Sequence, residues 1–94
     1  MIKTHDKIEK ACIEAKQKFD DLGMIEYSDI RSKLEFVIGS YRFDRNPIGL
    51  YKIGTEALTI LKKHHEANPK QIPKKLINDL EKALAQQHSL NYLI

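Results

Sequence analysis

Apolar residues recur near the start of the chain at alternating steps of four and three. The residues on this spacing are Ile8, Cys12, Ala15, Phe19 and Leu22. Such spacing places them on one side of an α-helix. Gly23 follows the last of them and predicts a left-handed cap that ends the helix. The first segment is therefore predicted to be a helix with one buried stripe.

A second apolar stripe predicts another helix, which is expected to begin between Ile25 and Asp29. Its members are Ile30, Leu34, Val37 and Tyr41, with Ile38 at the edge of the stripe. Residues 42–46 are predicted to form a connection. Asn46-Pro47 then predicts a new helix, because an Asn side chain accepts free amide hydrogens and a first-turn proline loses no hydrogen bond.

The third and fourth stripes predict two further helices. The third helix should run to about Glu66 and bury Leu50, Ile53, Ala57, Leu58, Ile60 and Leu61. The fourth could begin at Asn68-Pro69 or at Pro73. A start at Pro73 is favoured, because an earlier start would leave this proline without the amide that bonds back one turn. Its apolar face comprises Leu76, Ile77, Leu80, Ala83 and Leu84.

Together the four segments predict an all-α fold, an antiparallel up-and-down four-helix bundle. Connections of about three to six residues favour antiparallel packing of successive helices. A chain of 94 residues is long enough for one domain, residues 1–94, with a single apolar layer between its helices.

Composition favours a folded cytoplasmic protein. Hydrophobic residues make up 41% and charged residues 31% of the chain, which suits a globular domain. No apolar run approaches the ~20 residues needed to span a bilayer. The first residues lack the apolar stretch of a signal peptide, and the single cysteine has no partner for an internal disulfide.

No arrangement of reactive residues predicts catalysis. Cys12 lies within an apolar stripe and is expected to be a small buried hydrophobe. His64 and His65 point about 100° apart on a helix, so they do not form the i,i+4 pair of a helical zinc site. Asp20-Asp21 is expected to be a solvated helix end. The chain is therefore expected to be no enzyme and to hold neither metal nor cofactor.

The positive charge lies in the second half of the chain. The net charge is +3; residues 1–47 hold nine basic and nine acidic side chains, whereas residues 48–94 hold seven and four. Five basic residues gather around the last predicted turn: Lys62, Lys63, Lys70, Lys74 and Lys75. They could bind an acidic partner or anionic headgroups, or form a solvated helix end. Nucleic acid is not expected, since acidic residues are interspersed.

Some large apolar residues do not fit the stripes. Ile13, Phe36 and Ile48 lie more than about 90° from the centres of their predicted apolar faces. The last residues, Tyr92-Leu93-Ile94, are also apolar. These residues could be scattered exposed hydrophobes, or they could cluster into an interaction patch.

The segment from Tyr27 to Leu80 combines an Asn-Pro helix start with a polar turn before Gln-x-x-Lys-Lys-Leu. The residues in this pattern are Tyr27-Ser28-Asp29-Ile30, Leu34, Val37, Pro47, Leu50, the apolar residues of the third helix, Gln71, Lys74-Lys75-Leu76 and Leu80. In this pattern the chain resembles the immunity proteins of pediocin-like bacteriocins, the enterocin A immunity family.

The resemblance implies a cytosolic, non-catalytic four-helix bundle that protects a bacterium from a pore-forming peptide. Such proteins act from inside the cell on the bacteriocin-bound membrane components of the mannose phosphotransferase transporter. Contact with this receptor or with the membrane surface is expected from Lys62, Lys63, Lys70, Lys74, Lys75, Tyr92, Leu93 and Ile94. The alternative is a small helical adaptor or regulator that binds another protein.

Overall fold

The computed structural model describes the backbone of residues 4–92 and the side chains of residues 5–85. Within this range the chain is helical and contains no strand. Its elements are α1 (Thr4–Leu22), the short 3-10 helix η1 (Ile25–Tyr27), α2 (Ser28–Asp44), α3 (Ile48–Ala67) and α4 (Lys74–Tyr92). The prediction of an all-α fold with four helices is confirmed.

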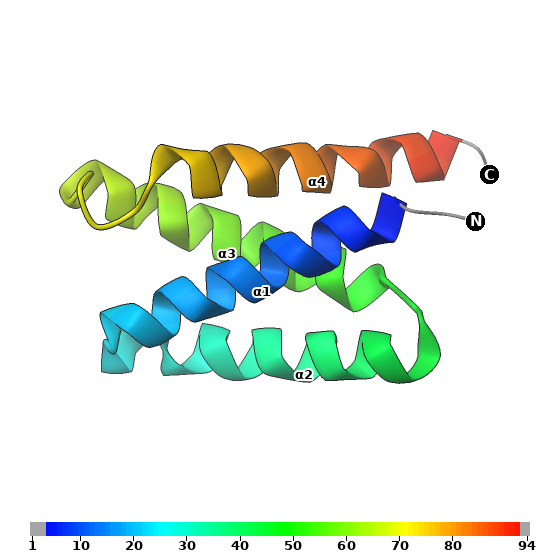
Figure 1. Cartoon of the computed structure of the whole chain (residues 1–94), viewed down its shortest axis with the longest axis horizontal. Coiled ribbons are helices and arrows are strands. Elements are labelled where there is room, and N and C mark those ends of the chain that lie inside the picture. Colours follow the sequence, from blue (N-terminus) through cyan, green and yellow to red (C-terminus); the bar gives the residue numbers. More distant parts are fainter. Residues whose placement is uncertain (1–3, 93–94) are drawn as a thin grey trace.

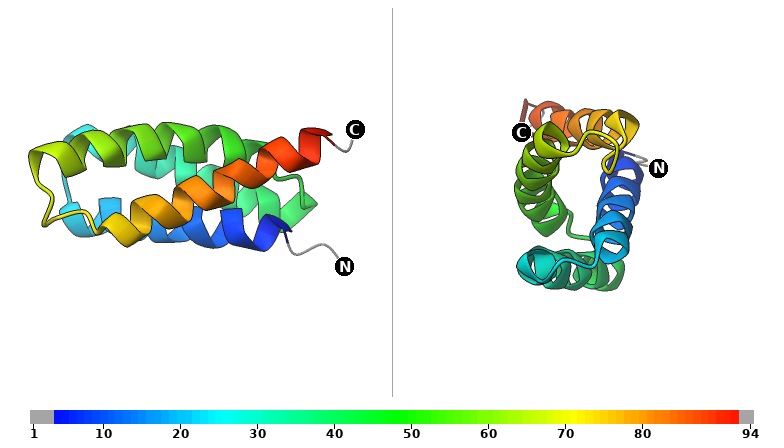
Figure 2. Two further views of the ribbon diagram at one scale, coloured as in Figure 1. Left: turned by 90° about the horizontal axis from the view of Figure 1, so that it is seen from above. Right: turned by 90° about the vertical axis from the view of Figure 1, so that its left-hand side faces the viewer.

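The helices pack side by side in a bundle that measures 39 × 23 × 17 Å. Successive helices run in opposite directions, so α1 begins and α4 ends at the same end of the bundle (Figure 1). Viewed along the bundle, the helices are arranged around a square, one along each side (Figure 2). Each helix packs against its two neighbours around the square, and α1 also reaches α3 across it. The bundle is therefore of the up-and-down kind expected for short connections.

Local sequence accounts for three of the helix ends. Gly23 has a φ of 61°, and its amide donates to the Phe19 carbonyl at 3.1 Å, as the predicted left-handed cap requires. The Asn46 side chain accepts the Ile48 amide at 3.1 Å. At the start of α4, the Pro73 carbonyl accepts the Leu76 amide at 3.1 Å. The predicted starts at Asn46-Pro47 and at Pro73 are thus confirmed.

The predicted connection over residues 42–46 was wrong in its extent. Helix α2 continues through Asp44, and Arg45 adopts the left-handed conformation, with a φ of 60°. The Arg45 amide donates to the Tyr41 carbonyl at 2.7 Å, and its guanidinium lies 5.6 Å from the centre of the Tyr41 ring. These two contacts close the helix without glycine, so the break comes later than predicted.

The predicted stripes meet in one core. The largest fully buried side chains are Phe19, Ile8, Leu34, Leu50, Leu61, Ile72, Leu80 and Cys12. Four residues of the predicted stripes are only half-buried at the edge of the core: Leu22, Leu58, Ile60 and Leu84. Tyr51 and Ile72 are buried although neither was assigned to a stripe.

The residues outside the stripes divide into two groups. Ile13 is half-buried and packs against the core, so its assignment as an off-core residue was wrong. Phe36 and Ile48 are exposed, as expected. Ile25 and Phe43 are exposed as well. All four exposed side chains belong to η1, α2 or the first turn of α3.

Candidate functional site

Three of the five predicted lysines lie open to solvent at the α3–α4 end of the bundle. Lys63, Lys70 and Lys74 are exposed, and none of them forms an ion pair with another described side chain. The other two are paired. Lys62 lies 2.6 Å from Glu81 on α4, and Lys75 lies 3.0 Å from Asp79 one turn along α4. The free cationic charge therefore lies on the connection and on the helix ends beside it.

A buried histidine holds this connection in place. His64 is 7% exposed, and its Nε2 lies 2.6 Å from the Gln71 Oε1. Because a carboxamide oxygen only accepts, Nε2 carries the hydrogen and Nδ1 is the acceptor. The Tyr27 hydroxyl donates to that Nδ1 at 2.7 Å. Both nitrogens of His64 are thus satisfied by residues outside α3.

The second half of the connection is fixed by His65 and Ile72. The Nδ1–H of His65 donates to the Ile72 carbonyl at 2.8 Å, and the Ile72 side chain is fully buried. The Gln71 amide also donates to the Asn68 carbonyl at 3.0 Å. Lys70 and Lys74 consequently project from a turn with a defined shape.

The backbone of α4 runs from the basic α3–α4 end of the bundle to the opposite end (Figure 1). Tyr92 is the last residue of α4, at the helix end opposite Lys74. At 1.5 Å per residue the two backbones are roughly 27 Å apart. The Tyr92 side chain and residues Leu93 and Ile94 lie outside the described part of the structure.

The structure instead brings Lys75 together with lysines that sequence reasoning did not select. A groove of about 300 Å³ runs between α1 and α4, which lie side by side (Figure 1). Its charged lining is Lys7, Lys10, Glu14, Lys75, Asp79 and Lys82. The small side chains of Ala11 and Ala83 also line it and are buried, which lets the two helices approach closely.

The groove has an excess of positive charge. Four lysines face two carboxylates, and one of those carboxylates, Asp79, is paired with Lys75. The hydrogen bond to Asp79 raises the pKa of the Lys75 ammonium group, which keeps it charged. Lys7, Lys10 and Lys82 form no ion pair with another described side chain. We call this set, Lys7, Lys10, Lys75 and Lys82, the groove lysines.

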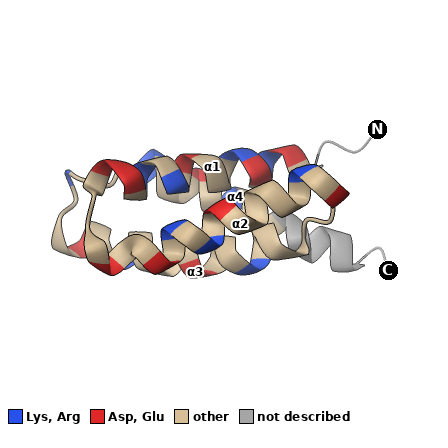
Figure 3. Ribbon diagram, turned by 90° about the horizontal axis from the view of Figure 1, so that it is seen from below, with Lys and Arg blue, Asp and Glu red and all other residues tan. Residues whose placement is uncertain are grey.

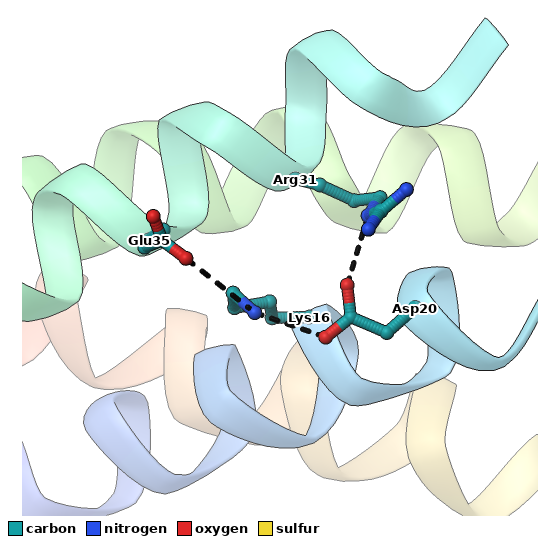
Figure 4. A network of polar contacts seen from close by, with 4 residues as sticks. All are labelled: Lys16, Asp20, Arg31 and Glu35. Carbon is teal, nitrogen blue, oxygen red and sulfur yellow. Dashed lines mark hydrogen bonds and ion pairs between the residues drawn. The ribbon is translucent and has the colours of Figure 1, made fainter. Parts of the chain in front are cut away.

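The neighbouring face between α1 and α2 is different, because its charges neutralise one another. Asp20 accepts from Lys16 at 2.9 Å and from Arg31 at 2.8 Å, and Lys16 also lies 3.8 Å from Glu35 (Figure 4). The hydrogen bond from Lys16, with that from Arg31, lowers the pKa of Asp20. This closed network leaves little net charge to attract a ligand.

The described residues offer little for covalent chemistry. Cys12 is fully buried, its thiol points at the Leu50 carbonyl at 3.5 Å, and burial raises the pKa of the Cys12 thiol to about 12. A thiol in this state is a poor nucleophile. Within the described side chains, no three His, Cys, Asp or Glu residues gather as metal ligands would.

None of the described helices is long and apolar enough to cross a membrane. Comparison of the chain with protein-family models, with curated proteins and with solved structures finds no match.

Proposed function

We propose that this chain is a bacteriocin immunity protein that protects its cell from a pore-forming, pediocin-like peptide. The proposal rests on the resemblance carried by the Asn46-Pro47 and Gln71 to Leu76 segments. It is supported by the four-helix bundle, in which helices start after Pro47 and at Lys74. The observation that supports it most is the set of groove lysines, together with the exposed Lys63, Lys70 and Lys74 at the α3–α4 turn. A surface with this charge suits anionic headgroups and acidic protein segments at a membrane.

The proposed mechanism is binding without catalysis. The protein acts from the cytoplasmic side on the membrane components of the mannose phosphotransferase transporter when the bacteriocin occupies them. If it binds only the occupied receptor, it shifts that receptor toward a closed state by its differential affinity. A folded bundle is suited to this role, because its backbone is already ordered before binding and the cost of ordering is limited to the contacting side chains.

The second candidate is a helical adaptor that binds another soluble protein. It is favoured by the exposed large hydrophobic side chains, of which Phe36 is 74% and Phe43 91% exposed. Aromatic side chains are enriched at protein interfaces. An adaptor needs neither a bacteriocin nor the transporter, so one experiment separates the two candidates.

The test is expression of the protein in a sensitive bacterium that carries the mannose transporter. Expressing cells should survive at least one pediocin-like bacteriocin at concentrations that kill cells with an empty vector. The peptide recovered from the medium should keep its intact mass, because the proposal involves no degradation. Equal killing of both cultures by a panel of such peptides would reject the immunity function and leave the adaptor.

A further inference from the structure

The outward face of α2 carries two exposed aromatic side chains that the bundle does not use. Phe36 and Phe43 lie on the side of α2 opposite its buried stripe, and they are 74% and 91% exposed. Figure 3 shows the bundle from the side of this helix, with α1 and α3 on its flanks. An exposed pair of phenylalanines one heptad apart is a costly surface for a chain that remains alone.

Between the two rings lies a glycine that the bundle does not require. Gly39 sits in the interior of α2, and a Cβ built on it meets no atom within 4 Å. Glycine at such a position costs about 1 kcal/mol relative to alanine. No contact within the described chain accounts for this cost, whereas close approach of a second molecule to Gly39 would.

The spacing of these residues matches the seam of a coiled coil. Ser32, Phe36, Gly39 and Phe43 follow one another at steps of four, three and four, so small and large residues alternate along one line. If a second α2 lies antiparallel on this face, Phe36 meets Gly39 of the other copy and Phe43 meets Ser32. In two antiparallel copies related by a two-fold axis, the numbers of contacting residues have a constant sum. Both pairs sum to 75, so one axis produces all of these contacts.

Charges on one flank fit the same arrangement. Glu35 and Arg42 lie on the α1 side of the seam. Within the chain Glu35 lies 3.8 Å from Lys16 and Arg42 donates to Glu9 at 3.2 Å, but their side chains remain 75% and 63% exposed and can also face a second copy. They occupy equivalent heptad positions, which face each other in an antiparallel pair. Their residue numbers sum to 77, so Glu35 of each copy lies near Arg42 of the other. The arrangement also brings the exposed Ile25, just before α2 in one copy, toward the exposed Ile48, just after α2 in the other.

We propose that the outward face of α2 is a self-complementary surface on which two copies of this chain form an antiparallel dimer. Four phenylalanine rings bury roughly 600–1,000 Å² in such a contact. This is below the standard size of a stable interface and typical of weak association. The dimer should therefore form and dissociate with concentration. The proposal does not depend on the immunity function.

The test is sedimentation equilibrium of the purified full chain over about a hundredfold range of concentration. The wild type should shift from monomer to dimer. Gly39→Glu should raise the dimer dissociation constant at least about tenfold, because it fills the space for the partner's Phe36, and circular dichroism should show unchanged helix content. Thr59→Glu adds the same charge to an exposed position of α3 and should leave the association unchanged.

Charge exchange provides the second arm of the test. Glu35→Arg should weaken the dimer, and the double variant Glu35→Arg with Arg42→Glu should restore it, since the pair is then re-formed in reverse. A wild type that stays monomeric throughout the range would overturn the proposal. So would a dimer that Gly39→Glu leaves intact, or a monomer whose Phe36 and Phe43 instead mediate binding to anionic phospholipid vesicles.

Discussion

At the scale of single residues, burial determines what Cys12 can do. The thiol is fully buried, and burial raises its pKa to about 12, so the reactive thiolate is scarce at neutral pH. We expect a thiol reagent such as Ellman's reagent to label the folded protein far more slowly than the urea-unfolded chain at the same pH. Rapid, stoichiometric labelling of the folded protein would show that the Cys12 side of the core opens readily.

Asp20 makes a pH-dependent contribution to stability. Its pKa is lowered in the folded state by hydrogen bonds from Lys16 and Arg31. The stabilisation is therefore present above the ordinary pKa of the carboxyl group and is lost as the pH falls through the lowered one. We expect Asp20→Asn to lower the free energy of unfolding at pH 7 and to match the wild type in strong acid. Urea unfolding at several pH values measures this, and Asp21→Asn serves as the neighbouring control.

The role of His64 could not be predicted from the sequence. From the sequence, His64 and His65 could only be compared with the i,i+4 spacing of a helical zinc site. That comparison says nothing about partners from other elements. The actual partners, Tyr27 and Gln71, come from η1 and from the α3–α4 connection. Their convergence depends on the packing of three elements, and local periodicity carries no signal for it.

At the scale of helices, two glycines respond differently to the same substitution. A Cβ on Gly39 meets open space, whereas one on Gly49 would lie 3.0 Å from the Val37 Cγ1. Val37 is β-branched and buried, so its side chain has little freedom to move away. We expect Gly39→Ala to stabilise the protein by about 0.5–1 kcal/mol and Gly49→Ala to destabilise it by about 1–2 kcal/mol.

Urea unfolding of dilute protein compares these two variants directly. Dilution keeps self-association through α2 from affecting the result for Gly39. Equal stabilisation by both substitutions would show that α2 and α3 do not approach as closely at Gly49 as the structure places them.

Helix ends could be predicted where the sequence has a residue type with a strong preference for helix ends, such as glycine, asparagine or proline. Gly23, Asn46 and Pro73 act through their own backbone or side-chain chemistry, and each ends or starts a helix as predicted. The end of α2 was not predictable in this way. Arg45 takes a conformation unusual for a residue other than glycine. The Tyr41 carbonyl and ring one turn earlier hold it there, and neither residue type is by itself a signal for a helix end.

At the scale of the whole molecule, periodicity was sufficient for the bundle but not for the candidate site. Each stripe predicts which residues face inward, and short connections then leave one simple arrangement. The groove lysines depend on which helices become neighbours. Lys75 and Lys82 share a face of α4 because they are seven residues apart, but the sequence does not tell that Lys7 and Lys10 lie across from them.

The packing of α1 against α4 leads to a prediction about protection from the bacteriocin, and this prediction rests on the proposed function. Lys7 and Lys10 line the same groove as Lys75, so reversing both to Glu should weaken protection about as much as reversing Lys74 and Lys75. A lysine near an anionic surface contributes about 1 kcal/mol, so two reversals should cost at least about tenfold in binding.

Lys52→Glu, on α3 outside this groove, is the control and should protect like the wild type. The readout is the bacteriocin concentration that stops growth of cells with equal amounts of each variant. Loss of protection confined to the Lys74 and Lys75 variant would move the contact from the α1–α4 groove to the α3–α4 turn.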